Sequence, residues 1–323
     1  MERFQILSRC SADQINLAAR SLINGKLVAF PTETVYGLGA DARNKSAVAR
    51  IYEVKGRPQD HPLIVHLHNL SAVEEWVREI PEYAIFLARD FWPGPMTLIL
   101  NRSTIAGDFI TGGQETVGIR IPDHPIALAL LTSFHELGGK GIAAPSANRF
   151  GHVSPTSALA VSEEIAEFLS VTDIILDGGD CHVGVESTII DCTGDNPVIL
   201  RPGAISEDMV QESAKVETMQ NSSVRIIRAS GMLEKHYSPK CKIILDETPI
   251  AGQGFLALSN MKTPKGVVRI ASPKNLKEFA QVLYKSFRKA DELNLKSLIV
   301  HQPEGEGLAV AIRDRLSKAA NGR

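Results

Sequence analysis

The 323-residue sequence has little of several features that mark special classes of protein. Its four cysteines are widely spaced and include no C-x-x-C pair, which argues against a disulfide framework or a zinc site and favours reduced thiols. No apolar run reaches the ~18 residues that a membrane span needs, and the N-terminal MERFQILSRC lacks the apolar stretch of a signal peptide. We therefore expect a cytoplasmic protein without a membrane partner.

Excess charge of one sign is also lacking. The 35 lysines and arginines against 37 aspartates and glutamates leave a net charge of −2, so the whole chain has no general attraction to nucleic acids, although a local basic patch stays open. The fingerprints G-x-G-x-x-G and G-x-x-x-x-G-K-[ST] are absent, which excludes the two commonest nucleotide-binding motifs.

The order of predicted elements indicates an α/β protein with two domains. Up to about residue 205, short apolar strands alternate with helices in some places and follow one another directly in others, which predicts a twisted mixed β-sheet with flanking helices. Residues 204–240 are polar and lack a clear period, as is typical of a linker. After the linker, strands and helices alternate regularly, which predicts a small Rossmann-like domain. We place the boundaries at 1–205, 206–240 and 241–323.

Three segments carry residue types that suit a polar ligand. In PTETVYGLGAD (31–41), hydroxyls and glycines follow a buried strand and predict a tight loop, which is either a ligand site or a structural turn. Lys55 and Arg57 flank Gly56 at the end of a helix, where they form either a solvated pair that complements the helix dipole or a site for an anion. Ser146 and Asn148 follow a short strand, without the G-x-S-x-G elbow of a serine hydrolase, which favours binding over nucleophilic attack.

Strand alternation adds a further candidate. In TVGIRI (116–121), Thr116, Gly118 and Arg120 share one face, while the three aliphatic residues between and after them share the other. A buried arginine needs a partner, which is either a core carboxylate or a ligand carboxylate. The histidines at 61, 66 and 68 have no H-E-x-x-H or Cys/His grouping, so we expect no protein-bound structural metal.

Seven motifs in register resemble one family, the threonylcarbamoyl-AMP synthases. They are PTETVYGLGAD, KGRPxxxPLIVH, WPGPMTLIL, VGIRIPDHP, APSAN, VESTIID and RPG, which together span most of residues 20–205. The chain also resembles the two-domain form, in which an H-Y-x-P motif of the linker reaches over the active site. Here that motif is His236-Tyr237-Ser238-Pro239.

The resemblance implies an enzyme, an L-threonylcarbamoyladenylate synthase of the nucleotidyltransferase class. The implied reaction condenses L-threonine, bicarbonate and ATP to threonylcarbamoyl-AMP and releases pyrophosphate, as the first step of tRNA threonylcarbamoyladenosine modification. Mg²⁺ is expected to arrive with ATP. The product would pass to a tRNA threonylcarbamoyl transferase, and weak RNA binding stays open.

The resemblance also implies residue roles. The family's catalytic K-x-R…S-x-N set matches Lys55, Arg57, Ser146 and Asn148. Threonine binding is implied for Thr34, His66, Arg120, Ala144 and Ser187. ATP binding is implied for Arg57, His61, Thr116, Ser146, Ser154, Arg201 and Tyr237.

One position departs from the family pattern. His61 stands where the family often has asparagine. Histidine can change charge near neutral pH, so ATP affinity is expected to depend on pH. Two other interpretations compete with the synthase: a double-stranded RNA-binding module, which would show a steep salt dependence, and a nucleotide-binding regulatory module.

Overall fold

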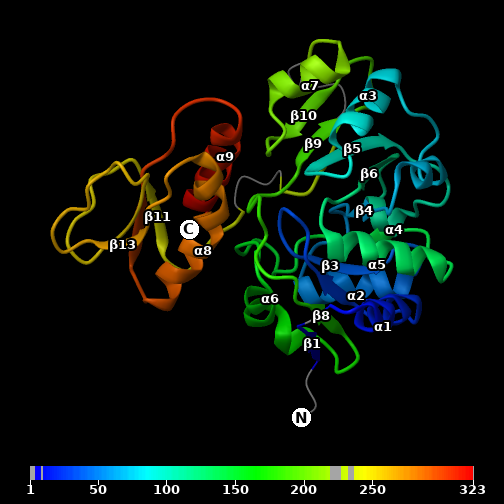
Figure 1. Ribbon diagram of the computed structural model, residues 1–323, viewed down its shortest axis with the longest axis horizontal. Coiled ribbons are helices and arrows are strands. Elements are labelled where there is room, and N and C mark those ends of the chain that lie inside the picture. The colour runs from blue at the N-terminus through cyan, green and yellow to red at the C-terminus, as the bar shows by residue number, and fades with distance from the viewer. Residues whose placement is uncertain (1–3, 9, 219–226, 232–235, 323) are drawn as a thin grey trace.

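The protein consists of two α/β units that lie side by side (Figure 1). The computed structural model describes residues 4–8, 10–218, 227–231 and 236–322. The larger unit is built on a ten-stranded sheet, the smaller on a four-stranded parallel sheet. This architecture confirms the predicted fold class.

The larger sheet is mixed. Its strands are β1 (Gln5–Leu7), β2 (Val28–Phe30), β3 (Gly37–Asp41), β4 (Ile64–His66), β5 (Met96–Asn101), β6 (Thr116–Arg120), β7 (Ile142–Ala143), β8 (Ile174–Leu176), β9 (Thr188–Asp191) and β10 (Val198–Arg201). They lie in the order β1-β8-β2-β3-β7-β4-β6-β5-β9-β10. Parallel pairs such as β4 with β6 occur beside antiparallel pairs such as β5 with β6.

Helices cover both faces of this sheet. Helices α1 (Ala12–Ile23) and α5 (Pro125–Glu136) pack together over Val28 and Phe30, whereas Ala29 belongs to a larger core cluster on the other face. That second cluster includes side chains of α2 (Lys45–Lys55), α3 (Glu82–Phe91) and α6 (Ala158–Ile165). The short elements are α4 (Asp108–Thr111), η1 (Leu70–Glu75) and η2 (Ala166–Phe168).

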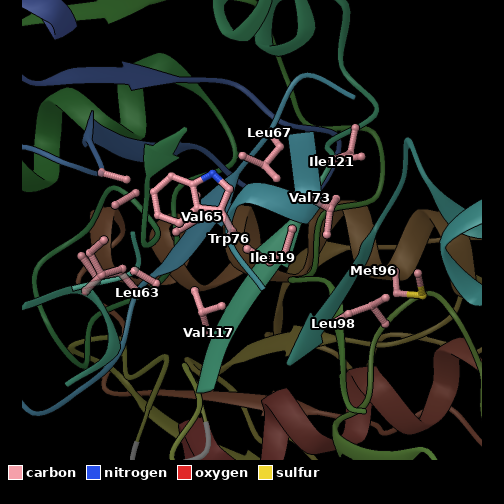
Figure 2. Close-up of a cluster of buried hydrophobic side chains, with 14 of the residues drawn as sticks. Leu63, Val65, Leu67, Val73, Trp76, Met96, Leu98, Val117, Ile119 and Ile121 are labelled. Carbon is pink, nitrogen blue, oxygen red and sulfur yellow. The ribbon is translucent and has the colours of Figure 1, made fainter. Parts of the chain in front are cut away.

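Side chains of β4 and β6 point alternately to the two faces of the sheet, so one set packs in the core and the other faces the candidate site. Val65, Val117 and Ile119 pack with Trp76 in the larger cluster (Figure 2). Residues between them point to the opposite face, where the parallel register pairs His66 with Arg120. The predicted division of residues 116–121 between two faces is therefore confirmed.

The prediction of a loop at residues 31–41 is wrong for the second half of this segment. Gly37–Asp41 forms strand β3, which pairs with β2 and β7. A Cβ on Gly39 would lie 2.7 Å from a methyl carbon of Ile142 and 2.9 Å from the Phe30 ring. Glycine is therefore required here by close strand packing and not by a turn.

The expected linker also contains regular structure. Helix α7 (Glu207–Ala214) begins at Ser206, whose hydroxyl accepts the Met209 amide, and the Ser213 hydroxyl donates to Asp90 at the end of α3. The helix is too short for its two buried apolar residues, Val210 and Ala214, to reveal a period in the sequence. Residues 219–226 and 232–235 of the expected linker lie outside the described residues.

The smaller unit has strands β11 (Lys242–Leu245), β12 (Gly254–Leu256), β13 (Val268–Ala271) and β14 (Ser297–Val300) in the order β11-β14-β12-β13. Helices α8 (Leu276–Glu292) and α9 (Leu308–Ala320) lie between this sheet and the larger unit (Figure 1). No helix in the described part of the chain is long and apolar enough to cross a membrane.

Candidate active site

One cavity collects most of the predicted site residues. It is lined by the ends of β4, β6 and β10, the loops after β2 and β7, the turn before β9, and residues 230–231 and 236–237. We call it the central cavity. Eight predicted residues line it: Arg57, His66, Arg120, Ala144, Ser146, Ser187, Arg201 and Tyr237.

Arg120 at the end of β6 has a carboxylate partner inside the protein. Its Nη2 donates to Glu33 Oε1 at 2.6 Å and to Thr34 Oγ1 at 3.0 Å, and both members of the ion pair are buried. Arg120 Nε has no partner among the described residues. The alternative of a core carboxylate therefore holds. Thr34 itself lies behind Arg120 and does not line the cavity.

His66 faces the same part of the cavity. Burial, and then the charge of Arg120, lower the pKa of His66 to about 3, so its imidazole is neutral at physiological pH. Its Nδ1 has no partner among the described residues, which leaves it able to form a hydrogen bond with a ligand.

Arg57 enters the cavity from the turn after α2. Its Nη2 donates to the Pro62 carbonyl at 3.0 Å and to Ser230 Oγ at 3.2 Å. Burial, as the largest cause, lowers its pKa to about 10. The side chain therefore stays cationic in a place with little water, where a charge acts strongly on an anion.

Lys55 has a different position from the one expected. The residue is 2% exposed, and its ammonium donates to the main-chain carbonyls of Ser146 and Asn148, at 2.6 and 2.5 Å. Burial lowers the pKa of Lys55 well below its usual value. Lys55 thus fixes the loop that presents Ser146 and does not line the cavity itself.

Asn148 also acts within the loop. Its Nδ2 donates to the carbonyls of Arg149 and His152, and its Oδ1 has no partner among the described residues. Asn148 is buried and does not line the central cavity.

Arg201 and Ser187 form a further part of the cavity wall. Arg201 donates from Nε and Nη2 to the Ser187 carbonyl, from Nη2 to the Ser187 hydroxyl at 3.1 Å, and from Nη1 to the Ser230 carbonyl. The Ser187 hydroxyl also lies 2.8 Å from Thr97 Oγ1. This network fixes Ser187 and ties residue 230 to the end of β10.

Tyr237 closes the cavity from the side of the second unit. Its ring stacks on Tyr284 at 5.6 Å and lies under the Arg315 guanidinium at 5.4 Å, while its hydroxyl has no partner among the described residues. Its backbone is left-handed, with a φ of 60°, a costly conformation for tyrosine that packing must hold in place. Gly231 lies against the Tyr237 hydroxyl, where a Cβ would be only 2.5 Å away.

The other predicted ATP residues lie outside the central cavity. Thr116 lines an adjacent hollow that shares Ile64 and Ser230 with it. His61 packs edge-on against Phe150 at 5.3 Å. Ser154 is buried, and its hydroxyl helps to lower the pKa of Glu186, a residue of the cavity wall.

Sequence reasoning missed Glu186, the acidic residue of the described cavity wall. Its Oε2 accepts hydrogen bonds from Arg315 Nε and the Tyr284 hydroxyl, each at 2.8 Å. Burial raises its pKa, but Arg315 and Arg201 outweigh burial and lower it to about 2. The described residues contain no group of three or more side chains that could hold a metal ion.

Comparisons with known proteins identify the family of the chain. A family model described as "Telomere recombination" matches residues 20–203, and one described as "Threonylcarbamoyl-AMP synthase, C-terminal domain" matches residues 204–321. The chain is 40% identical to the threonylcarbamoyl-AMP synthase of Pyrococcus abyssi, over 96% of this chain and 95% of the relative. The chain belongs to the threonylcarbamoyl-AMP synthase family.

Other relatives support this membership. The threonylcarbamoyl-AMP synthase of Bacillus subtilis is 38% identical over 96% of this chain and 94% of its own length. The crystal structure of P. abyssi Sua5 complexed with L-threonine superposes with a TM-score of 0.87 at 37% identity, over 99% of this chain and 98% of that one. The YciO protein of Escherichia coli, at 24% identity and a TM-score of 0.54, shares the fold over 63% of this chain.

The sequence did not reveal Glu33 and Glu186 for the same reason. Glu33 lies inside PTETVYGLGAD and Glu186 inside VESTIID, so both were in view. Their partners, Arg120 and Arg315, lie 87 and 129 positions away. An unpaired carboxylate inside an apolar motif was the one signal that could have indicated them.

Proposed function

We propose that this protein is an L-threonylcarbamoyladenylate synthase, a nucleotidyltransferase that condenses L-threonine, bicarbonate and ATP. The observation that carries the proposal is the convergence of Arg57, Arg120 and Arg201 on one cavity in a chain that belongs to this family. The P. abyssi protein was crystallised as a complex with L-threonine, and its fold matches this chain almost over its full length. The curated relatives favour this function over an RNA-binding or regulatory module.

The reaction brings two anions together. The threonine amine combines with bicarbonate to give an N-carboxylate and water. A carboxylate oxygen then attacks the α-phosphorus of ATP, and the bond between that phosphorus and the bridging oxygen to the β-phosphate breaks to release pyrophosphate. Fixed cations and donors in a site with little water lower the repulsion between the anions and stabilise the charge that develops on the phosphoryl oxygens.

The residues divide between the two substrates by position. Arg120, through its unpartnered Nε, His66, Ala144 and Ser187 would hold threonine, with Thr34 orienting Arg120. ATP would be held by Arg57, Ser146, Arg201 and Tyr237 in the central cavity, with Thr116 and His61 outside it. Lys55, Asn148 and Ser154 would support the loop that carries Ser146. Holding three reactants in line removes much of the entropic barrier.

Magnesium enters as part of the nucleotide substrate. The described residues provide no three-ligand group for a resident metal ion, so phosphate and water oxygens would supply most of its ligands. A cytoplasmic location stays our prediction from the widely spaced cysteines. Transfer of the product to a tRNA threonylcarbamoyl transferase stays a prediction from the family resemblance. The domain limits 1–205, 206–240 and 241–323 stay a prediction from the order of elements in the sequence.

The test is pyrophosphate release from ATP by the purified protein, with threonine and bicarbonate each omitted in turn. Release that needs both, together with transfer of label from bicarbonate into an adenylate, is the expected result. Release that ignores threonine would overturn the proposal, and so would binding of ATP without turnover.

A further inference from the structure

The ring of Phe150 is contacted by three side chains from two distant segments of the chain. The Arg57 guanidinium lies over the ring at 5.6 Å from its centre. The rings of His61 and His236 meet it edge to face, at centre distances of 5.3 and 6.4 Å. We propose that Phe150 is a positioning residue of the active site: its ring orients the guanidinium of Arg57 and also supports the segment that carries His236 and Tyr237.

The backbone of Phe150 is fixed by hydrogen bonds that involve Lys55. Its amide donates to the Lys55 carbonyl at 2.8 Å, while the Lys55 ammonium binds the carbonyls of Ser146 and Asn148. One buried lysine therefore anchors both ends of the loop 146–150, through its side chain and its main chain. The Phe150 ring projects from a backbone that has little freedom to move.

The hydrogen bonds of Arg57 do not determine the tilt of its guanidinium plane. Nε and Nη2 donate along one edge, to carbonyls of residues 61 and 62 and to Ser230, which fixes the position of that edge. No hydrogen bond from Nη1 to a described residue accompanies them. The tilt of the guanidinium plane about that edge decides where Nη1 points, and the guanidinium carbon lies over the face of the Phe150 ring. A cation–π contact is strongest where water is excluded, as it is for the buried Arg57.

The same ring supports the segment from the second half of the chain. Next to Phe150, the Gly151 carbonyl accepts the Ser238 amide at 3.0 Å. The His236 ring rests against Phe150 and, at 4.0 Å, against Tyr237. Burial lowers the pKa of His236 to about 3, so a neutral imidazole lies on the ring and adds no charge beside Arg57. Orientation of Arg57 and closure by residues 236–238 thus depend on one side chain.

The inference rests on the proposed function, because it assigns Arg57 to ATP. Two variants separate the ring face from the ring volume. Phe150→Leu keeps an apolar side chain but removes the π face, and Phe150→Tyr keeps the face. The chain offers a matched control in Phe168→Leu, because Phe168 lies under Arg149 at 4.2 Å, a pair of the same chemistry whose members do not line the central cavity.

For Phe150→Leu we expect the Kd and KM for ATP to rise by about 3- to 30-fold, the range of a partly to fully desolvated cation–π contact. The KM for threonine should change less than the KM for ATP. Phe150→Tyr should restore most of the ATP affinity, and Phe168→Leu should behave as the unchanged protein. Hydrogen exchange at the Ser238 amide should be faster in Phe150→Leu than in either of the other two variants.

Three results would overturn the inference: unchanged ATP affinity in Phe150→Leu, equal losses in the leucine and tyrosine variants, or an equal loss in Phe168→Leu. Thermal unfolding of each variant shows whether a loss of ATP affinity comes from misfolding. If Phe150→Leu is misfolded, the ATP affinity of Phe150→Tyr alone tests the inference. Calorimetric ATP binding keeps this test apart from the proposed function. An unmodified protein that binds ATP without threonine-dependent pyrophosphate release defeats the proposed function, whereas unchanged binding in Phe150→Leu defeats only the role of Phe150.

Discussion

The cations around the central cavity differ in how many of their donors are already used. The Lys55 ammonium donates to two carbonyls, and Arg201 donates to Ser187 and to the carbonyl of residue 230. Arg57 keeps Nη1 and Arg120 keeps Nε without a partner among the described residues. Arg57 and Arg120 are therefore the cations best able to contact substrates, while Lys55 acts by fixing the loop.

Removal of the Arg57 side chain should reduce catalysis without unfolding the protein. For Arg57→Ala we expect a loss on the order of 2–4 kcal/mol of transition-state stabilisation, the usual scale for a lost charge-stabilising donor. The measurement is kcat/KM for pyrophosphate release. Arg43→Ala is the control, since Arg43 lies in the exposed turn before α2. Near-normal activity of Arg57→Ala would contradict the assignment.

The pH dependence expected for His61 changes once its surroundings are known. Burial, and then the charge of Arg57, lower the pKa of His61 below its ordinary value of 6.5. His61 is therefore neutral between pH 6.5 and 8, and ATP affinity should be flat there as far as His61 decides it. Below pH 6.5, protonation adds a positive charge beside the nucleotide, so binding should tighten.

The measurement is calorimetric ATP binding between pH 5.5 and 8, compared with His61→Asn. The asparagine variant shows the titration of ATP itself, so only the difference between the two proteins reports on His61. A difference that develops between pH 7 and 8 would show that the pKa of His61 is not lowered.

At the scale of elements, close strand packing sets the shape of the site. Strand β3 passes near β7 because Gly39 has no side chain, and this approach places the start of β3 against the loop of Ser146, with which Gly37 forms a bridge. A larger residue at position 39 would push apart two strands that border the cavity.

Gly39→Ala should therefore destabilise the protein by about 1–3 kcal/mol, the usual cost of overpacking a well-packed core. Urea unfolding measures the change. Gly194→Ala provides the comparison, because a Cβ at Gly194 meets nothing within 4 Å, and its effect should stay within about 0.5 kcal/mol. Equal stabilities of the two variants would show that β3 can move to accept a methyl group.

At the scale of the whole molecule, the second unit supports the cavity wall from behind. Arg315 of α9 and Tyr284 of α8 hold Glu186, and Lys318 donates to the Gly231 carbonyl at 2.8 Å. Two further ion pairs, Lys285 with Asp180 and Arg288 with Glu164, connect the units. Side chains of the second unit thus hold two residues of the cavity wall, Glu186 and Gly231, without lining the cavity themselves.

Glu186→Gln should cost on the order of 1–3 kcal/mol of unfolding free energy, because it removes one of the two carboxylates that pair with the buried Arg315 guanidinium and leaves only Asp314. The folded-state pKa of Glu186, about 2, lies below its ordinary value of 4.5. Its stabilising contribution is therefore complete above pH 4.5 and is lost as the pH falls toward 2.

Unfolding free energies measured across that pH range provide the check. The difference between the unchanged protein and Glu186→Gln should shrink as the pH falls, whereas Glu115→Gln, which removes an exposed carboxylate, should have a small effect. A difference that does not vary with pH would show that the Glu186 carboxylate is not the stabilising group.

The sequence alone determined the order of most strands and helices, the division of residues 116–121 between two faces, and the motifs that resemble the family. These depend on local periodicity and on residue types within short segments. It did not reveal strand β3, because two glycines in five residues indicate a turn unless the close neighbour across the sheet is known. Nor did it reveal helix α7, which owes its stability to packing on α3.

Only the tertiary structure decided which charges face the cavity. Arg120 and Arg57 are both arginines in family motifs, yet one is paired with Glu33 and the other lies on the ring of Phe150. Lys55 points inward to a loop more than 90 positions away, and Glu186 meets Arg315 across the two units. Such pairs form only when the sheet register and the docking of the second unit bring distant segments together, and no local pattern in the sequence encodes that contact.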